Sequence, residues 1–151
     1  MATKTETARA LRDGRSLLRK YGYPCDVSMA EFIRWLRTET PYPNPTFDEV
    51  VSNRYYVVHE LAEIGEVRRM GLRITKDVIL RHMLKVDRAH EKAAEAEFAI
   101  ARNCGARDHL RARLGDVRAW SRDPTLPPSR RRRYVRLGRE LARALAAMGG
   151  R

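Results

Sequence analysis

The sequence predicts an all-α fold, a single-domain bundle of about six helices built around a long antiparallel helical hairpin over about 46–103. Apolar residues recur at helical spacing along most of the chain. No segment shows the convincing apolar–polar alternation of a strand. We expect one domain to span residues 1–151, because a chain of this length can bury a hydrophobic core without disulfide bonds or structural metals.

The first helix of the hairpin is predicted to begin after Thr46 and to end at Gly71. Thr46 stands three residues before Glu49, an arrangement in which the hydroxyl and the carboxylate each satisfy a free backbone N–H. An apolar stripe follows it. Gly71 is typical of a helix end, because glycine adopts the left-handed conformation that closes a helix.

The return helix is predicted to begin after Thr75 and to carry an apolar stripe at heptad spacing. Two positions of this stripe are polar, His90 and Glu97. Burying either side chain alone costs several kcal/mol. We therefore expect both to be hydrogen-bonded, ion-paired or metal-bound.

A candidate metal site lies between the two helices of the hairpin. If the turn is centred near residue 73, antiparallel pairing places His59 level with Asp87. His59, Glu63, Asp87 and His90 are then expected to meet, and facing helices of a bundle supply imidazole and carboxylate groups of this kind to metals. We predict that these four residues hold a divalent metal ion. The alternative is a polar cluster that fixes the register of the two helices without a metal.

Four shorter helices complete the prediction. They cover residues 4–20, a short segment that opens at Ser28 with Glu31 in a second capping box, and the ranges of about 107–120 and 129–148. Proline-bearing connectors are expected over 40–46 and 121–128.

Positive charge is concentrated in the C-terminal region, 104–151. Residues 101–151 carry 14 basic and 4 acidic side chains, against 17 and 15 in residues 1–100. Arginines that open the last helix and continue along one face are suited to phosphate contacts, which predicts nucleic-acid binding. These residues are Arg130, Arg131, Arg132, Arg133, Arg136, Arg139 and Arg143. The alternatives are a solvated helix face in an arginine-rich protein, or an anionic protein or membrane partner.

A short motif opens the same region. The segment Arg102-Asn103-x5-His109 resembles the Arg-x4-6-His motif of HEPN ribonucleases, which often has asparagine after the arginine; Arg54-x4-His59 matches its spacing too. The resemblance implies a helical ribonuclease in which His109 transfers protons and Arg102 stabilises phosphate charge.

Composition bounds the remaining expectations. No stretch has the 18 apolar residues of a membrane span, no apolar signal core is present, and Cys25 and Cys104 lack metal-site spacing, so we expect a cytoplasmic protein with reduced thiols. Arginine accounts for 26 of 31 basic residues and glutamine is absent, as in a thermophile or under a biased genome composition. The wide apolar faces of the hairpin favour a homo-oligomer.

Two functions follow from these patterns. The first is a helical binding module whose His/carboxylate cluster holds a divalent metal. The alternative is a nucleic-acid-binding protein, conceivably a HEPN-like ribonuclease, that acts through the arginine-rich C-terminal region. Whether the protein is an enzyme stays open at this point.

Overall fold

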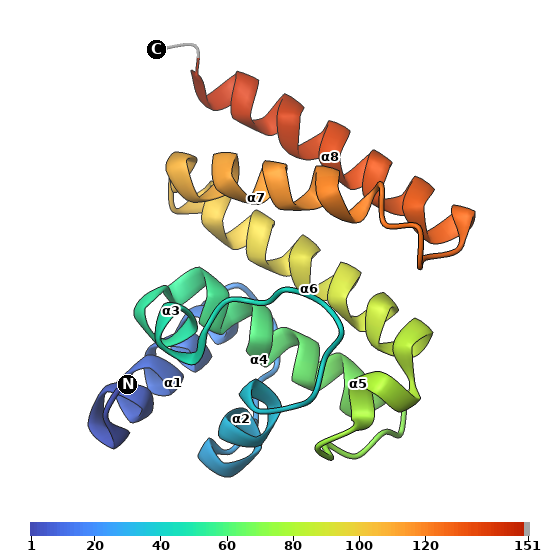
Figure 1. Cartoon of the computed structure of the whole chain (residues 1–151). Helices are drawn as coiled ribbons and strands as arrows, with labels where there is room; N and C mark the ends of the chain where they lie inside the picture. Colours follow the sequence, from blue (N-terminus) through green and yellow to red (C-terminus); the bar gives the residue numbers. More distant parts are fainter. Residues whose placement is uncertain (150–151) are drawn as a thin grey trace. The chain divides into compact units, whose positions relative to one another are not determined.

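The computed structural model describes residues 1–149, and its regular structure is helical throughout. Eight helices occur in this part of the chain (Figure 1): α1 (Lys4–Lys20), α2 (Met29–Leu36), α3 (Phe47–Ser52), α4 (Arg54–Arg69), α5 (Val78–Arg81), α6 (Met83–Asn103), α7 (Arg107–Trp120) and α8 (Pro128–Gly149). No strand is present in residues 1–149. The predicted all-α class is therefore confirmed, with more helices than the expected six.

The chain divides into two compact units. Unit 1 covers Met1–Glu97 and unit 2 covers Phe98–Arg151, so that α6 begins in the first and ends in the second. That one domain spans residues 1–151 stays a prediction. Within the described residues, no helix has both the length and the apolar character needed to cross a membrane.

Helix α4 is the hub of unit 1, because α1, α2 and α3 all pack against it (Figure 1). Its side chains Val57, Val58, Leu61, Ile64 and Val67 are each at most 1% exposed. Trp35 of α2 is also buried, and its indole N–H donates to the Glu60 carboxylate at 2.6 Å. The core of unit 1 is thus organised along the whole length of α4.

The closest approach in unit 1 is between α1 and α4. Gly14 of α1 faces Val57, and a Cβ built on Gly14 would lie 2.5 Å from Cγ1 of Val57 and 3.1 Å from Cδ1 of Leu61. Only a residue without a side chain fits at this crossing.

The helix ends follow the signals in the sequence. Thr46 with Glu49, and Ser28 with Glu31, form complete capping boxes at the starts of α3 and α2. Gly71 adopts a φ of 81° after α4, the left-handed conformation expected at a helix end.

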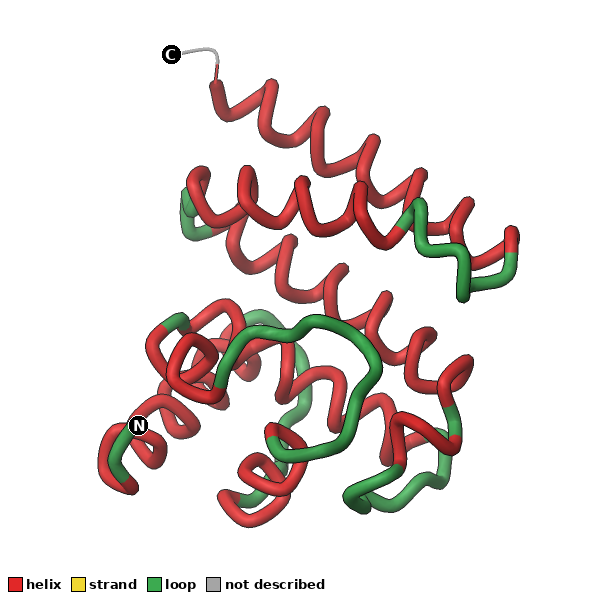
Figure 2. The backbone as a smooth tube through the Cα atoms, viewed as in Figure 1, coloured by secondary structure: helices red, strands yellow, loops and turns green. Residues whose placement is uncertain are grey.

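The predicted hairpin differs from the structure in two places. Its first helix is divided at Asn53, whose backbone is extended and whose Oδ1 accepts from the N–H groups of Tyr55 and Tyr56 to begin α4. Its turn is also longer than expected, because residues 70–77 form a loop and the one-turn helix α5 precedes α6 (Figure 2). The hairpin therefore has two breaks that its helical periodicity conceals.

Unit 2 contains the antiparallel pair α7 and α8, joined by the loop 121–127. Leu110 and Val117 of α7 are fully buried with Tyr134 of α8. The rings of Trp120 and Tyr134 meet edge to face, with centroids 5.5 Å apart. These contacts form the apolar face between α7 and α8.

The Gly14 contact generates a test of the α1–α4 crossing. We expect Gly14→Ala to lower the free energy of unfolding by about 1–2 kcal/mol, because the clash with the stiff Val57 side chain outweighs the gain in helix propensity. Gly115→Ala is the matched control: apart from its own helix backbone and chain neighbours, nothing lies within 4 Å of its Cβ position, so this substitution should raise stability by about 0.5–1 kcal/mol. Urea unfolding of both variants measures the difference, and equal effects would contradict the close crossing.

Candidate metal centre

Two side chains of the candidate site project from α4 on one face. His59 and Glu63 are one turn apart, and their side chains are only 3% and 7% exposed. Nε2 of His59 lies 3.3 Å from Oε2 of Glu63. Both residues lie among the buried apolar side chains of α4 and are removed from water. Their polar atoms therefore need hydrogen-bond or ionic partners within the protein.

The second half of the cluster comes from α6. Glu97 is fully buried, and its Oε2 lies 2.8 Å from Nδ1 of His59. His90 stands two turns earlier, with Nδ1 3.7 Å from Oε1 of Glu63 and with its ring edge to face on His59, centroids 4.8 Å apart. Its side chain is 26% exposed, so the cluster meets solvent at His90.

His59, Glu63 and His90 form a group that can hold a metal ion. One ligand atom from each residue lies within 4.8 Å of the others, two imidazole nitrogens and one carboxylate oxygen. Glu97 lies behind this group and contacts the opposite ring nitrogen of His59. The arrangement is thus three potential ligands with a fourth residue that orients one of them.

The neighbouring side chains in the cluster favour the charged forms of His59 and Glu63. Burial alone lowers the pKa of His59, but hydrogen bonds to Glu63 and Glu97 and the charges of these carboxylates outweigh it and raise the pKa to about 10. Burial raises the pKa of Glu63, yet the hydrogen bonds and positive charges of His59 and His90 outweigh it and bring the pKa well below its usual range. Without metal, His59 is therefore an imidazolium whose two N–H groups donate to carboxylates of α4 and α6.

The register of the hairpin differs from the sequence prediction. The structure places Glu97 against His59, ten residues beyond Asp87. The rise of an α-helix places Asp87 about 15 Å from Glu97 along α6. Asp87 is half-buried. The loop 70–77 and α5 cause this difference, because they lengthen the connection beyond the turn that was predicted to be centred near residue 73.

Three of the four predicted metal ligands therefore come together, and Asp87 is not part of their group. Sequence periodicity had identified Glu97 as a buried polar residue that needs a partner, but an incorrect register kept it from His59. Helical periodicity correctly predicted that Glu97 is buried. The register of the two helices was wrong because the length of the connection between them could not be predicted.

The first match to the HEPN motif belongs to unit 2. Arg102 and Asn103 are exposed at the end of α6, and the Asn103 amide donates to the Ala99 carbonyl at 2.8 Å. His109 is half-buried and lines a pocket of about 680 Å³ whose other lining residues do not include Arg102 or Asn103. In the second match to the motif, Arg54 donates to the Tyr55 hydroxyl at 2.7 Å.

The predicted nucleic-acid residues lie along α8. Arg132, Arg133, Arg136, Arg139 and Arg143 are exposed, whereas Arg130 and Arg131 are half-buried. The guanidinium of Arg130 stacks over the Tyr134 ring, 5.9 Å from its centroid. Most of the predicted set is thus presented to solvent.

Comparison with protein families, with curated proteins and with solved structures gives no match to this chain. Its function is therefore inferred from its own side chains.

The cluster predicts a pH dependence for the metal-free protein. His59 has a higher pKa folded than unfolded, so its contribution to stability is fully present below about pH 6.5 and lost as pH rises towards about 10. Glu63 has a lower pKa folded than unfolded, so its contribution is present above about pH 4.5 and lost at lower pH. With a chelator present, we expect urea unfolding to show stability falling from about pH 6.5 to about pH 10.

The Glu97→Gln variant tests the assignment of this slope to the cluster. The amide removes a charge that raises the pKa of His59, so stability should decline over a narrower range of alkaline pH than in the wild type. Identical profiles for the two proteins would contradict the role of the Glu97 carboxylate.

Proposed function

We propose that this protein binds one divalent transition-metal ion in unit 1 through His59, Glu63 and His90. The supporting observation is the convergence of two imidazoles and one carboxylate, with ligand atoms within 4.8 Å of one another, between α4 and α6. Imidazole ligands suit Zn²⁺, Fe²⁺ and similar ions, whereas Mg²⁺ and Ca²⁺ prefer sites made only of oxygen.

The cluster has the outer group that metal-binding histidines usually need. A ligating histidine commonly donates its second N–H to a carboxylate, which fixes the tautomer and the ring orientation. Glu97 occupies this position at 2.8 Å from Nδ1 of His59, leaving Nε2 directed at Glu63. A protonated His59 that only fixed helix register would need the two carboxylates but not a third converging ligand, so the position of His90 in the same group is what favours a metal.

A proton is the competitor of the metal at this site. An imidazole binds metal only when neutral, so metal must displace the proton that His59 holds between Nε2 and Glu63. Three protein ligands leave positions for water or an external group, as in zinc sites that are open to substrate. His90, the partly exposed member, lies on the side from which such a group would enter.

Metal content and titration test this proposal. We expect the untagged protein to bind about one equivalent of Zn²⁺ or Fe²⁺, with Glu97→Gln lowering the affinity about 10–100-fold. His90→Ala removes one of the three ligands and should lower the affinity further. His109→Ala is the control, since this half-buried histidine belongs to unit 2. Elemental mass spectrometry and competition with a metal-sensitive dye give stoichiometry and affinity.

Melting temperature supplies a second measurement. Metal that binds only the folded chain raises the melting temperature, and a chelator should reverse this in the wild type and in His109→Ala. Absence of saturable binding for Zn²⁺, Fe²⁺ and Mn²⁺ would leave His59 as a proton-bridged residue that fixes helix register.

A second function, nucleic-acid binding, rests on a separate observation in unit 2. Four exposed arginines at helical spacing form the α8 arginine stripe, defined as Arg132, Arg136, Arg139 and Arg143. Within residues 1–149, no acidic side chain forms an ion pair with any of the four. Uncompensated charge along one helix face is suited to a phosphate backbone.

The dimensions of the stripe favour a duplex over a single strand. It extends for about 16 Å along α8, a length over which duplex DNA presents roughly ten phosphates. Tyr134 is buried and Trp120 is half-buried against it, so neither offers a free face to stack on bases. We therefore propose contacts with the backbone and little base specificity.

Salt-dependent binding tests the stripe. For a labelled duplex of about 20 base pairs, replacing all four stripe arginines with glutamine should reduce the steepness of log K against log salt by about 3–4. Four exposed arginines of unit 1 provide a control with the same change in net charge: Arg9, Arg12, Arg37 and Arg88. Fluorescence anisotropy on DNA and RNA duplexes measures both variants. Equal losses in the two would show non-specific attraction, and no duplex binding by the wild type would exclude this function.

Self-association through the hairpin also stays a proposal. Leu80, Met83 and Leu84 are 36–49% exposed around the junction of α5 and α6, and they are the apolar side chains in this segment available for a second copy.

A further inference from the structure

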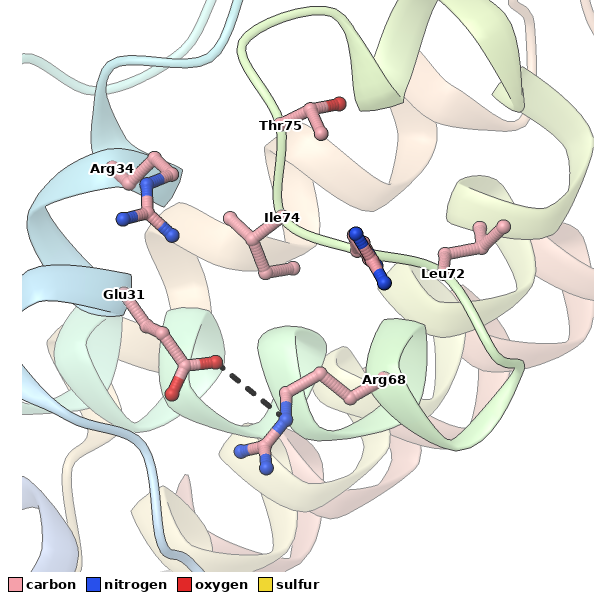
Figure 3. Close-up of a pocket in the computed structure, with 7 residues that line it drawn as sticks. Glu31, Arg34, Arg68, Leu72, Ile74 and Thr75 are labelled. Atoms are coloured by element: carbon pink, nitrogen blue, oxygen red, sulfur yellow. Dashed lines mark ion pairs between the residues drawn. The ribbon is translucent and has the colours of Figure 1, made fainter.

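A pocket unrelated to the His59 cluster opens in unit 1 beside the end of α4. It has a volume of about 560 Å³, within the range of small-ligand sites. Glu31 and Arg34 of α2 and Arg68 of α4 line one side, and the loop residues Leu72, Arg73, Ile74 and Thr75 line the other (Figure 3). The loop is the segment that lengthens the predicted hairpin, so the departure from a tight turn creates this wall.

The negative charge at the pocket is already neutralised. Nε of Arg68 lies 3.5 Å from Oε2 of Glu31, the ion pair drawn in Figure 3, and Nη1 of Arg68 lies 2.8 Å from Oδ1 of Asp26. Burial of charge is modest there, since the Arg68 side chain is 36% exposed. These ion pairs connect α4 to α2 and to the loop before α2. Glu31, the acidic residue of the pocket lining, is therefore paired.

Two guanidinium groups remain uncommitted at the pocket. Within residues 1–149, neither Arg34 nor Arg73 forms an ion pair or hydrogen bond with an acidic side chain. They come from the helix side and the loop side of the pocket, and the Arg34 side chain points towards Ile74 (Figure 3). A guanidinium fork is suited to bidentate contacts with a carboxylate or phosphate.

Two apolar side chains line the pocket together with the arginines. Ile74 is 6% exposed and Leu72 is half-buried. The Thr75 hydroxyl is already used, since it donates to Asp77 at 2.9 Å. Exposed guanidinium groups beside apolar side chains are the complement of a small amphipathic anion.

We infer that this pocket binds a small organic anion, with an oxyanion head held by Arg34 and Arg73 and a short apolar body against Ile74 and Leu72. The head is a carboxylate or a phosphate monoester, which share the bidentate oxygen geometry that guanidinium groups recognise. This site is independent of the metal function, because it shares no residue with the His59 cluster.

Four probes separate the contributions of head and body. Hexanoate and hexyl phosphate carry both parts, inorganic phosphate carries only a head, and hexanol carries only a body. In titrations of the full chain followed by amide chemical shifts, we expect one or both hexyl anions to shift residues 72–75 at lower concentration than phosphate or hexanol. The stronger hexyl anion identifies the head group.

Charge variants test the arginines. Replacing both Arg34 and Arg73 with glutamine should weaken the better hexyl anion at least about tenfold, since a charge-assisted hydrogen bond contributes about 1.5–3 kcal/mol. A double variant of the exposed Arg9 and Arg88 makes the same change in net charge away from the pocket, and it should bind within about twofold of the wild type.

Two results would overturn the inference. One is equal weakening in the pocket and control variants, which would indicate attraction by net charge alone. The other is absence of any shift in residues 72–75 with all four probes. Unchanged melting temperatures of both variants ensure that the comparison concerns folded protein.

Discussion

The buried imidazole of His59, placed between carboxylates of α4 and α6, is the interaction on which the arrangement of unit 1 depends. An imidazolium or a metal-bound imidazole is tolerated in an apolar core only if both ring nitrogens have partners. Glu63 satisfies one nitrogen from the same helix, and Glu97 satisfies the other from α6. A slip of α6 by one turn would leave at least one buried charge without a partner, so this cluster sets the register of the hairpin.

That requirement extends to the rest of unit 1 through α4. The face of α4 that does not carry His59 packs closely on α1 at Gly14, and Glu60 receives the Trp35 indole N–H from α2. Each contact constrains the rotation of α4 about its own axis, and that rotation determines where His59 and Glu63 project. The geometry of the candidate metal site is consequently a property of the packed unit and not of His59 and Glu63 alone.

Local signals predicted the helices well because they act within a few residues. Capping boxes at Ser28 and Thr46 and the left-handed Gly71 depend only on neighbouring backbone groups. The division at Asn53 was missed because helical periodicity continues through it, even though asparagine is a strong N-cap residue. The sequence thus contains both a signal for a new helix start at Asn53 and a continuous helical periodicity, and the prediction followed the periodicity.

The site was harder to predict, because its partners are separated by a connection whose path is not encoded by periodicity. His59, Glu63 and His90 were identified from their residue types and spacing, and the structure brings them together. Glu97 required the register, and the register depends on the loop 70–77 and α5. Its 0% exposure is the decisive observation, because a glutamate completely removed from water needs strong hydrogen-bond partners, and Nδ1 of His59 lies within hydrogen-bond distance.

The distribution of charge separates the proposed chemistries along the chain. Unit 1 carries 17 basic and 15 acidic side chains and has its carboxylates engaged in pairs such as Glu63 with His59, whereas unit 2 carries 14 arginines and 4 acidic side chains. A unit whose basic and acidic side chains are nearly equal in number can present carboxylates to a cation. Many arginines among those carboxylates would weaken cation binding. The candidate metal ligands lie within residues 59–90 and the α8 arginine stripe within residues 132–143, so each set can be changed without removing a residue of the other. The metal and polyanion hypotheses are therefore independent, and each can be true of the same chain.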